Sequence, residues 1–361
     1  MRAAVLNEQP GALVIEDITI AEPNDNEVLV RTVGAGLCHS DLHFMEAIFR
    51  AKVPAVLGHE SAGVVEAVGA NVQHVSEGDH VVCCLSVFCG LCRQCLSGHP
   101  NRCTNPKATM RGRDETPRLS RNGEAVDQFA HIGGFAEKML VHQNALVKIN
   151  PEMPLDRAAL IGCGVLTGTG AVFRTAAVEP GARVCVLGAG GIGLAAIQAA
   201  RITGAGQVVV VDVNDQKLET ARQMGATHTV NALEVDDVAS AVRDLSGGGV
   251  DYSFEAIGRK ATAEQAFNML DLGGTATVIG MVSSKEKLEI RGMDLLAEKK
   301  LQGSQMGSNQ FRVDIPNLVQ MYLDGRLMLD EMVSATLTLD QVNEGYDMMK
   351  KGEIARTVIT F

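Results

Sequence analysis

Tryptophan is absent from the 361 residues, and aromatic residues make up only 4% of the chain. So few rings cannot form the stacking platform with which many proteins bind single-stranded nucleic acid. No run of Lys or Arg occurs either, and the formal net charge is −11. An acidic surface repels phosphates, so we expect neither nucleic acid nor an anionic membrane surface as a partner.

Long apolar stretches are missing as well. The longest uncharged stretch, residues 184–200, contains four glycines and is typical of a strand, a turn and a helix. A membrane span would need about 20 predominantly apolar residues. The first eight residues lack the apolar core of a signal peptide. We therefore expect a cytoplasmic protein, and its length predicts two domains, possibly three.

Cysteine is the informative residue. There are nine cysteines, an odd number that argues against a disulfide framework in a chain without a secretion signal. Four of them, Cys89, Cys92, Cys95 and Cys103, lie within 15 residues. Four thiolates suit a tetrahedral zinc ion with no open position. We expect a structural zinc that closes a loop of little apolar content.

A second set of ligand-type residues is dispersed along the chain. Cys38, His59 and Cys163 lie in short segments that contain glycine. Two thiolates and one imidazole could hold a zinc ion with an open fourth position, which is the pattern of catalytic sites. Taken singly, each is more often a buried core or turn residue, and the combination with a dinucleotide site is what favours a metal.

The first 160 residues are typical of β-structure, with glycine turns. The segment 101–128 is polar and without a period, so we expect a long loop. After residue 162, strands near 184–187, 207–212, 227–230, 250–255 and 275–280 alternate with helices near 191–203, 215–224, 235–245 and 262–270. This alternation predicts an α/β domain with a doubly wound parallel sheet. The tail, with helices near 315–323 and 339–350 and a strand at 356–361, forms a third unit or completes the first.

A glycine-rich turn follows the strand at 184–187 and opens the next helix. Its candidate cofactor-binding residues are Gly188, Gly190, Gly191, Ile192 and Gly193. Small residues let the backbone approach a pyrophosphate, which the helix N-terminus attracts.

Asp212 ends the next strand, nineteen residues beyond Gly193. It can accept both hydroxyls of an adenosine ribose, which favours NAD over NADP. An N-cap role for Asp212 on helix 215–224 is compatible with this. Lys217 could also reach the ribose, or lie on a solvated helix face.

These motifs together resemble the zinc-containing, medium-chain alcohol dehydrogenases over essentially the whole chain. The matching segments are 38–41, 58–63, 89–103, 162–164, 188–193 with Asp212, and 355–361. The resemblance implies a GroES-like, β-rich catalytic domain built from residues 1–164 and 306–361, around a Rossmann domain at 165–305.

The resemblance also implies roles for single residues. Around the catalytic zinc they are the ligands Cys38, His59 and Cys163, the transient ligand Glu60, and a nearby carboxylate, Asp41. The proton relay would be Ser40 and His43; the cofactor contacts would include His39, Thr167 and Arg356; the substrate pocket would include Phe49, Leu85 and Phe129.

We therefore expect reversible oxidation of a small or medium-sized alcohol to an aldehyde or ketone, with NAD, two zinc ions per chain and a homodimer or homotetramer. The alternatives are a nicotinoprotein, whose NAD does not exchange, and a non-catalytic cofactor-binding protein, which would need neither Ser40 nor His43. The loop 104–131 has no familiar signature. The loop 47–53 carries Arg50 and Lys52 but no acid, which argues against a glutathione–formaldehyde adduct as substrate.

Overall fold

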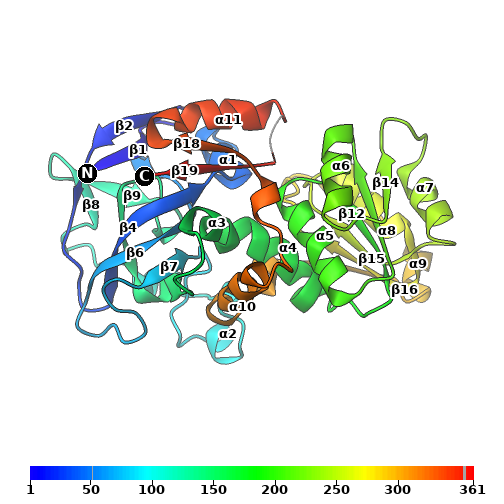
Figure 1. Ribbon diagram of the computed structural model, residues 1–361, viewed down its shortest axis with the longest axis horizontal. Coiled ribbons are helices and arrows are strands. Elements are labelled where there is room, and N and C mark those ends of the chain that lie inside the picture. The colour runs from blue at the N-terminus through cyan, green and yellow to red at the C-terminus, as the bar shows by residue number, and fades with distance from the viewer. Residues whose placement is uncertain (51, 353–354) are drawn as a thin grey trace. The chain divides into compact units, whose positions relative to one another are not determined.

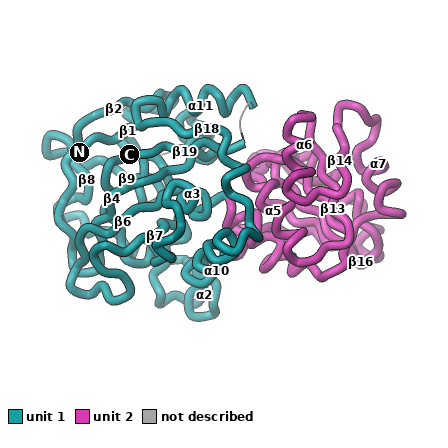
Figure 2. The backbone as a smooth tube through the Cα atoms, viewed as in Figure 1, with its two compact units in different colours: residues 1–164, 310–361 teal, residues 165–309 magenta. Residues whose placement is uncertain are grey.

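The computed structural model describes residues 1–50, 52–352 and 355–361. Two compact units form, residues 1–164 with 310–361, and residues 165–309 (Figure 2). Both ends of the chain therefore lie in the first unit.

The first unit contains two sheets. One has the order β2-β1-β5-β9-β8-β3, and the other has the order β11-β7-β6-β4-β19-β18, with β10 also paired to β4. Their bounds are β1 Arg2–Leu6, β2 Leu13–Asp17, β3 Thr19–Ile20, β4 Glu27–Gly36, β5 Ala55–Val56, β6 Glu60–Val68, β7 His80–Cys83, β8 Leu119–Arg121, β9 Glu124–Gln128, β10 Lys138–His142, β11 Leu146–Lys148, β18 Val333–Thr338 and β19 Arg356–Thr360. The C-terminal β19 pairs with β4, where Ile359 lies opposite Ala35, so the tail completes this sheet.

The helices of the first unit are short, apart from one near its C-terminal part (Figure 1). They are α1 His39–Met45, α2 Arg93–Leu96, α3 Leu155–Leu160, α10 Phe311–Leu323 and α11 Val342–Lys350. Helix α11 buries Val342, Tyr346 and Met349, which share one helix face. A Cβ on Gly345 would lie 2.4 Å from a Leu37 methyl carbon, so glycine there lets α11 approach the core closely.

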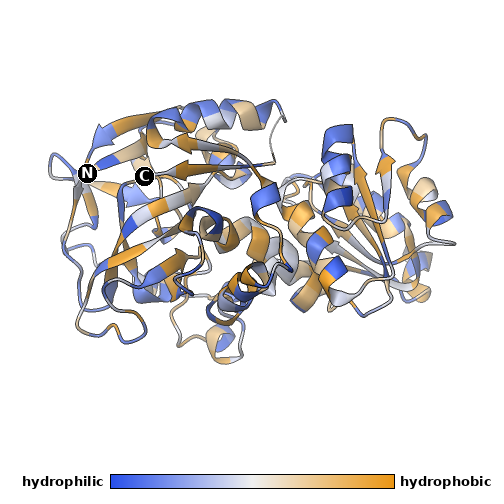
Figure 3. Cartoon of the chain, viewed as in Figure 1, coloured by the Kyte–Doolittle hydropathy of each residue, from blue (hydrophilic) through white to orange (hydrophobic). Residues whose placement is uncertain are grey.

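The second unit is a parallel sheet of order β14-β13-β12-β15-β16-β17. Counted from β12, this is the order 3-2-1-4-5-6 of a Rossmann fold, which confirms the predicted doubly wound sheet. The strands are β12 Arg183–Leu187, β13 Gln207–Asp212, β14 His228–Asn231, β15 Val250–Glu255, β16 Leu270–Val278 and β17 Lys300–Gly303. The helices are α4 Leu166–Gly170, α5 Gly191–Thr203, α6 Asp215–Gln223, α7 Val238–Leu245, α8 Lys260–Asn268 and α9 Gly292–Leu296. Figure 3 shows hydrophobic residues along the strands of this sheet and mostly hydrophilic residues in α6.

One helix of the described chain, residues 155–175, is long and apolar enough to span a membrane. However, 83% of its most apolar window is buried inside the protein, as in a core helix. It contains two π-helical turns, at Ile161–Val165 and Ala171–Thr175. Such turns are rare and often occur at functional sites.

The expectation of a long loop at 101–128 was wrong in part, because β8 and β9 form a hairpin there. Leu119 pairs with Val126 across it, and the turn residues Asn122 and Gly123 both have positive φ. An Asn-Gly pair is the common signal for such a turn. The hairpin buries only Leu119 and Val126, so its apolar alternation is too weak to detect.

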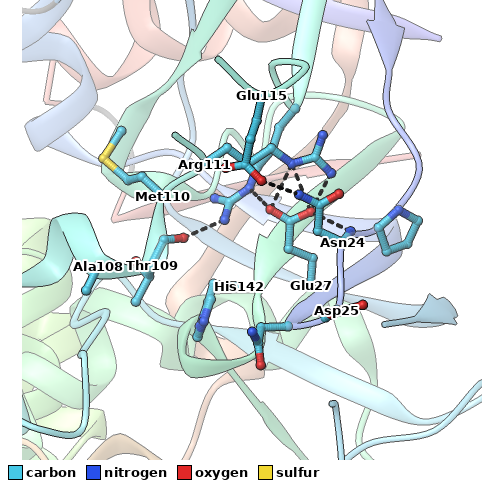
Figure 4. Close-up of a pocket in the computed structure, with 12 residues that line it drawn as sticks. Asn24, Asp25, Glu27, Ala108, Thr109, Met110, Arg111, Glu115 and His142 are labelled. Atoms are coloured by element: carbon cyan, nitrogen blue, oxygen red, sulfur yellow. Dashed lines mark hydrogen bonds and ion pairs between the residues drawn. The ribbon is translucent and has the colours of Figure 1, made fainter. Parts of the chain in front are cut away.

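A buried ion-pair cluster attaches the segment before this hairpin to β4 (Figure 4). The Glu27 carboxylate accepts hydrogen bonds from Arg111 Nε at 3.1 Å and from Arg118 Nε at 2.6 Å. Arg118 also donates to the Thr109 carbonyl. Burial would raise the pKa of Glu27, but the bond from Arg111 and the charge of Arg118 lower it overall. The cluster therefore holds a charged Glu27 in a nearly dry position.

Replacing this carboxylate should destabilise the first unit. Glu27→Gln leaves two guanidinium groups buried without their counter-charge, and removal of one partner from a buried pair costs about 3 kcal/mol or more. We expect a clearly lower midpoint of urea unfolding. Asp340→Asn is the matched control, since the pair of Asp340 with Arg2 is exposed and is worth less than about 1 kcal/mol. Equal shifts in the two variants would contradict the proposed weight of the cluster.

Candidate active site and metal centres

The four-cysteine loop already has the geometry of a tetrahedral metal site. The Sγ atoms of Cys92 and Cys95 are 3.4 Å apart, those of Cys92 and Cys103 are 3.9 Å apart, and those of Cys89 and Cys95 are 4.0 Å apart. Four sulfurs around a zinc ion at about 2.3 Å would be separated by about 3.8 Å. All nine cysteines of the chain are free, so disulfides do not compete for these sulfurs.

Backbone amides donate hydrogen bonds to sulfurs of this loop, although the pKa values of Cys95 and Cys103 are raised, chiefly by burial. The amide N–H groups of Leu91 and Cys92 donate to Cys89 Sγ, and that of Asn105 donates to Cys103 Sγ. Backbone N–H groups of Cys95 and Thr104 lower the pKa of the Cys92 thiol to about 5. Donors aimed at sulfur favour the deprotonated form that metals bind.

A second group of ligand-type atoms converges from three places in the first unit. The ligand atoms of Cys38, His59, Glu60 and Cys163 all lie within 4.8 Å of one another, and all four residues are buried. Cys38 precedes α1, His59 directly precedes β6, which Glu60 begins, and Cys163 lies in the first π-helical turn. A hydrogen bond from Cys163 and the charge of His59 lower the pKa of the Cys38 thiol well below its ordinary value.

The His59 imidazole is oriented by a carboxylate. Its Nδ1 lies 3.0 Å from Asp41 Oδ2, and Asp41 Oδ1 accepts the Gly58 N–H at 2.9 Å. Although burial disfavours the charged imidazole, the charges of Asp41 and Cys38 raise the pKa of His59 to about 10. Among the described residues, His59 Nε2 has no hydrogen-bond partner. A fully buried, unpartnered nitrogen beside two sulfurs fits a metal ion.

Glu60 is held in this cluster by a buried cation. Its carboxylate contacts the Arg356 guanidinium and accepts the Gly164 N–H at 3.1 Å. A Cβ on Gly36 would lie 2.4 Å from Glu60 Oε2, and one on Gly164 would lie 3.1 Å from Arg356 Nη1. A side chain at position 36 would therefore displace the Glu60 carboxylate, and one at position 164 would require Arg356 to shift by a few tenths of an ångström. The expected contact of Arg356 with a pyrophosphate stays a prediction.

Helix α1 carries the expected relay residues one turn apart. Ser40 Oγ lies 3.6 Å from Cys38 Sγ, and both Ser40 and His43 are partly buried. His43 Nδ1 has no hydrogen-bond partner among the described residues, and its ring packs edge-on against Phe49, with centroids 5.8 Å apart. His39, at the start of the helix, is exposed.

An aromatic cluster lies beside the His59 ring. Phe129 packs edge-on against His59 with centroids 5.5 Å apart, and Phe44 lies 4.5 Å from Phe129 and 5.9 Å from Phe49. Sequence reasoning missed Phe44, although its position next to His43 on the same helix was an available signal. Leu85, the third expected pocket residue, is partly buried against the core cluster that includes Val81 and Cys83.

The second unit carries the glycine turn where β12 meets α5. Gly188 has φ of +94°, and a Cβ on Gly193 would lie 1.8 Å from the Gly188 carbonyl oxygen. Gly190 differs, since its Cβ would meet nothing within 4 Å. Gly191 and Ile192 begin α5. The open space at Gly190 and the free N–H groups of the helix fit a dinucleotide pyrophosphate.

Asp212 lies at the end of β13 and holds this turn. Its Oδ2 accepts the Ala189 N–H at 2.8 Å, and its Oδ1 accepts the N–H groups of Val213 and Asn214. Asn214, and not Asp212, is the N-cap of α6. Lys217 lies partly exposed in the first turn of α6. Thr167 is buried in α4, with Oγ1 3.5 Å from Met306 Sδ.

Two family models match the chain. Residues 24–151 match the alcohol dehydrogenase GroES-like domain, and residues 191–323 match the zinc-binding dehydrogenase family. An S-(hydroxymethyl)glutathione dehydrogenase of Synechocystis is 37% identical, over 100% of this chain and 99% of the relative.

Two solved structures share the fold throughout. An alcohol dehydrogenase zinc-binding domain protein from Burkholderia ambifaria is 37% identical, with a TM-score of 0.96 over 100% of this chain and 98% of the other. The benzyl alcohol dehydrogenase of Acinetobacter calcoaceticus is 31% identical, with a TM-score of 0.94 over 100% and 99%.

The comparisons with known proteins and the geometry of the two units indicate the same fold and the same family. The predicted combination of a GroES-like unit with a Rossmann sheet is confirmed. The chain is an enzyme that uses zinc and NAD. It belongs to the family of zinc-containing alcohol dehydrogenases.

Proposed function

We propose that this enzyme reversibly oxidises a small or medium-sized alcohol to an aldehyde or ketone, with free exchange of NAD. The observation that carries the proposal is the buried convergence of Cys38, His59 and Cys163, with an unpartnered His59 Nε2. In this proposal these three residues are the ligands of a catalytic zinc, and Glu60 is an additional carboxylate within reach of the same ion.

The cofactors supply two kinds of chemistry when bound: zinc is a Lewis acid that makes an alcohol more acidic, and NAD accepts a hydride. The chain's own residues provide position. Asp41 fixes the tautomer and direction of His59, which is the common role of a carboxylate behind a metal-bound histidine. Arg356 balances the charge of Glu60 in a buried position.

Proton removal falls to α1. Ser40 lies beside Cys38 and can take the alcohol's proton, and His43 is placed one turn later to receive it. The half-buried position of both side chains lets the proton reach solvent.

The four-cysteine loop is proposed to hold the second, structural zinc. All four protein ligands are sulfurs, so no position stays open for a substrate. Around them, α2 and the 3-10 turn Pro100–Arg102 bury only Asn101. This loop has too little apolar content to fold by burial alone.

The substrate is proposed to carry an apolar, ring-sized group. The Phe44, Phe49 and Phe129 rings form an apolar surface that reaches His59, the proposed zinc ligand. The benzyl alcohol dehydrogenase of Acinetobacter, named for such an alcohol, supports this proposal. The Synechocystis relative is named for a glutathione adduct, and that substrate is the competing outcome. The cytoplasmic location and the dimeric or tetrameric state stay predictions.

A comparison of alcohols tests the proposed function. With NAD and purified enzyme, benzyl alcohol should give NADH at 340 nm, with kcat/KM at least about 10-fold above that of ethanol, because ring burial strengthens binding. Phe129→Ala should reduce the rate with benzyl alcohol and leave that with ethanol nearly unchanged. Higher efficiency with S-(hydroxymethyl)glutathione would overturn the proposed substrate class. Turnover without release of NADH would indicate a nicotinoprotein.

Metal analysis tests the two-zinc proposal. The purified protein should contain two zinc ions per chain. Cys163→Ala should give a folded, inactive protein with one zinc, whereas Cys92→Ala should aggregate or melt at lower temperature, because folding of its loop depends on the metal. Elemental analysis and thermal unfolding measure the two effects. One zinc per wild-type chain, with Cys163→Ala fully active, would refute the catalytic site.

Cofactor preference tests the proposed role of Asp212. Charged hydrogen bonds to the ribose hydroxyls are worth about 1.5–3 kcal/mol, so NAD should be preferred over NADP by roughly 10- to 150-fold. Asp212→Ser should lower kcat/KM with NAD and raise it with NADP. Since Asp212 also holds the turn, a disordered turn would instead lower both efficiencies. Wild-type enzyme that used NADP as well as NAD would exclude this role.

A further inference from the structure

Tyr346 is a buried polar residue that the proposed mechanism leaves unused. It lies on the inner face of α11 with an exposed fraction of 1%. By residue volume, its side chain is the largest fully buried one among the described residues. A buried tyrosine usually finds a hydrogen-bond partner for its hydroxyl. The chain has three tyrosines, and the other two, Tyr252 and Tyr322, are partly exposed.

The surroundings of the Tyr346 ring place it next to the metal cluster. Phe135 packs edge-on against it, with centroids 6.3 Å apart. The Phe135 ring and amide in turn lie against Gly58, where a Cβ would be only 2.7–2.8 Å from them. Gly58 is the residue before His59, and its N–H donates to Asp41. The ring therefore belongs to the packed layer that holds the His59 segment.

The hydroxyl of Tyr346 lies within reach of the Asp41 carboxylate and of the Cys38 backbone. Within the described part of the chain, neither Tyr346 Oη nor Asp41 Oδ2 makes a hydrogen bond of standard geometry. Asp41 Oδ2 lies 3.0 Å from His59 Nδ1, and a carboxylate oxygen has a second lone pair, so it can also accept the buried tyrosine hydroxyl and satisfy that donor. A phenolic hydroxyl is protonated at neutral pH, so it can donate this hydrogen bond.

We propose that the Tyr346 hydroxyl donates a hydrogen bond to Asp41 and so acts as a positioning residue for His59 at the catalytic zinc. The inference rests on the proposed function, because His59 is a zinc ligand only there. Asp41 would then be fixed at three points: by the Gly58 N–H, by His59 Nδ1 and by the tyrosine hydroxyl. Without the hydroxyl, the carboxylate is held at two points only, and the imidazole that it orients is held less rigidly.

Removal of a single oxygen atom tests the proposal. Tyr346→Phe keeps the ring and its packing, and Tyr322→Phe is a matched control that removes a hydroxyl bonded to Asp330 in the same unit. We measure zinc release into excess chelator with a colorimetric indicator. Cys163→Ala, which keeps only the four-cysteine zinc, identifies the release phase of each site.

Catalytic zinc should leave Tyr346→Phe about 10-fold faster than wild type, the lower end of the effects seen for groups behind metal ligands. Release from the four-cysteine site should not change. A cobalt(II)-substituted Tyr346→Phe enzyme should also show shifted visible absorption bands, because the ligand field at His59 changes. Tyr322→Phe should match wild type in all three measurements.

A packing control separates positioning from loosening of the helix. Val342→Ala creates a small cavity on the same face of α11 and keeps the hydroxyl. The inference would be overturned if Val342→Ala accelerated zinc release as much as Tyr346→Phe does, or if Tyr346→Phe showed the zinc release and spectra of the wild type. The proposed function would survive either result, provided that the wild-type protein contains two zinc ions. A wild-type protein with only the four-cysteine zinc would remove both.

Discussion

The buried contact between Asp41 and His59 is the constraint around which the first unit is arranged. The carboxylate lies in α1 and the imidazole at the start of β6, and both side chains have no exposed surface. A charge in such a place must be compensated on every side. The compensation comes from the imidazole and from the Gly58 N–H. Because these groups come from different elements, the fold cannot shift α1 against β6 without exposing or orphaning a charge.

The neighbouring pair of Glu60 and Arg356 also compensates buried charges by pairing, and here the space for the pair depends on a glycine. Arg356 begins the last strand, β19, and Glu60 begins β6, with β4 between these strands in the sheet. The residue of β4 opposite Glu60 is Gly36, where any side chain would occupy the carboxylate's position. Glycine at this point is therefore a condition for placing two opposite charges inside a sheet.

The sequence was sufficient for features that are local along the chain. Three such features are the glycine turn, the four-cysteine loop and the alternation of strands and helices. Each depends on interactions between residues that are close together in the chain. Contacts between distant segments gave no such pattern, except for the dispersed ligands Cys38, His59 and Cys163, which the dinucleotide site and the family resemblance connected. Nothing in the sequence distinguishes Phe44 from other aromatic residues, because its importance depends on the packing against Phe129. Tyr346 likewise differs from other core residues only through its position near Asp41. The hairpin at β8 and β9 was not predicted because it buries only Leu119 and Val126, and the Glu27 cluster that holds the segment before it joins residues far apart in the chain.

The π-helical turn at Ile161–Val165 has a consequence for how the two units can recombine. Cys163 is held in this turn, and the chain passes into the second unit at Val165, within the same helix. Cys163, which carries a sulfur of the proposed metal site, and the first residues of the cofactor-binding unit therefore lie in one continuous helix. A chimera joined at the unit boundary would cut through that turn, whereas one joined after Thr175 would inherit it whole. Exchange of cofactor units between relatives is therefore constrained to keep the helix in one piece, with the unit that supplies Cys163.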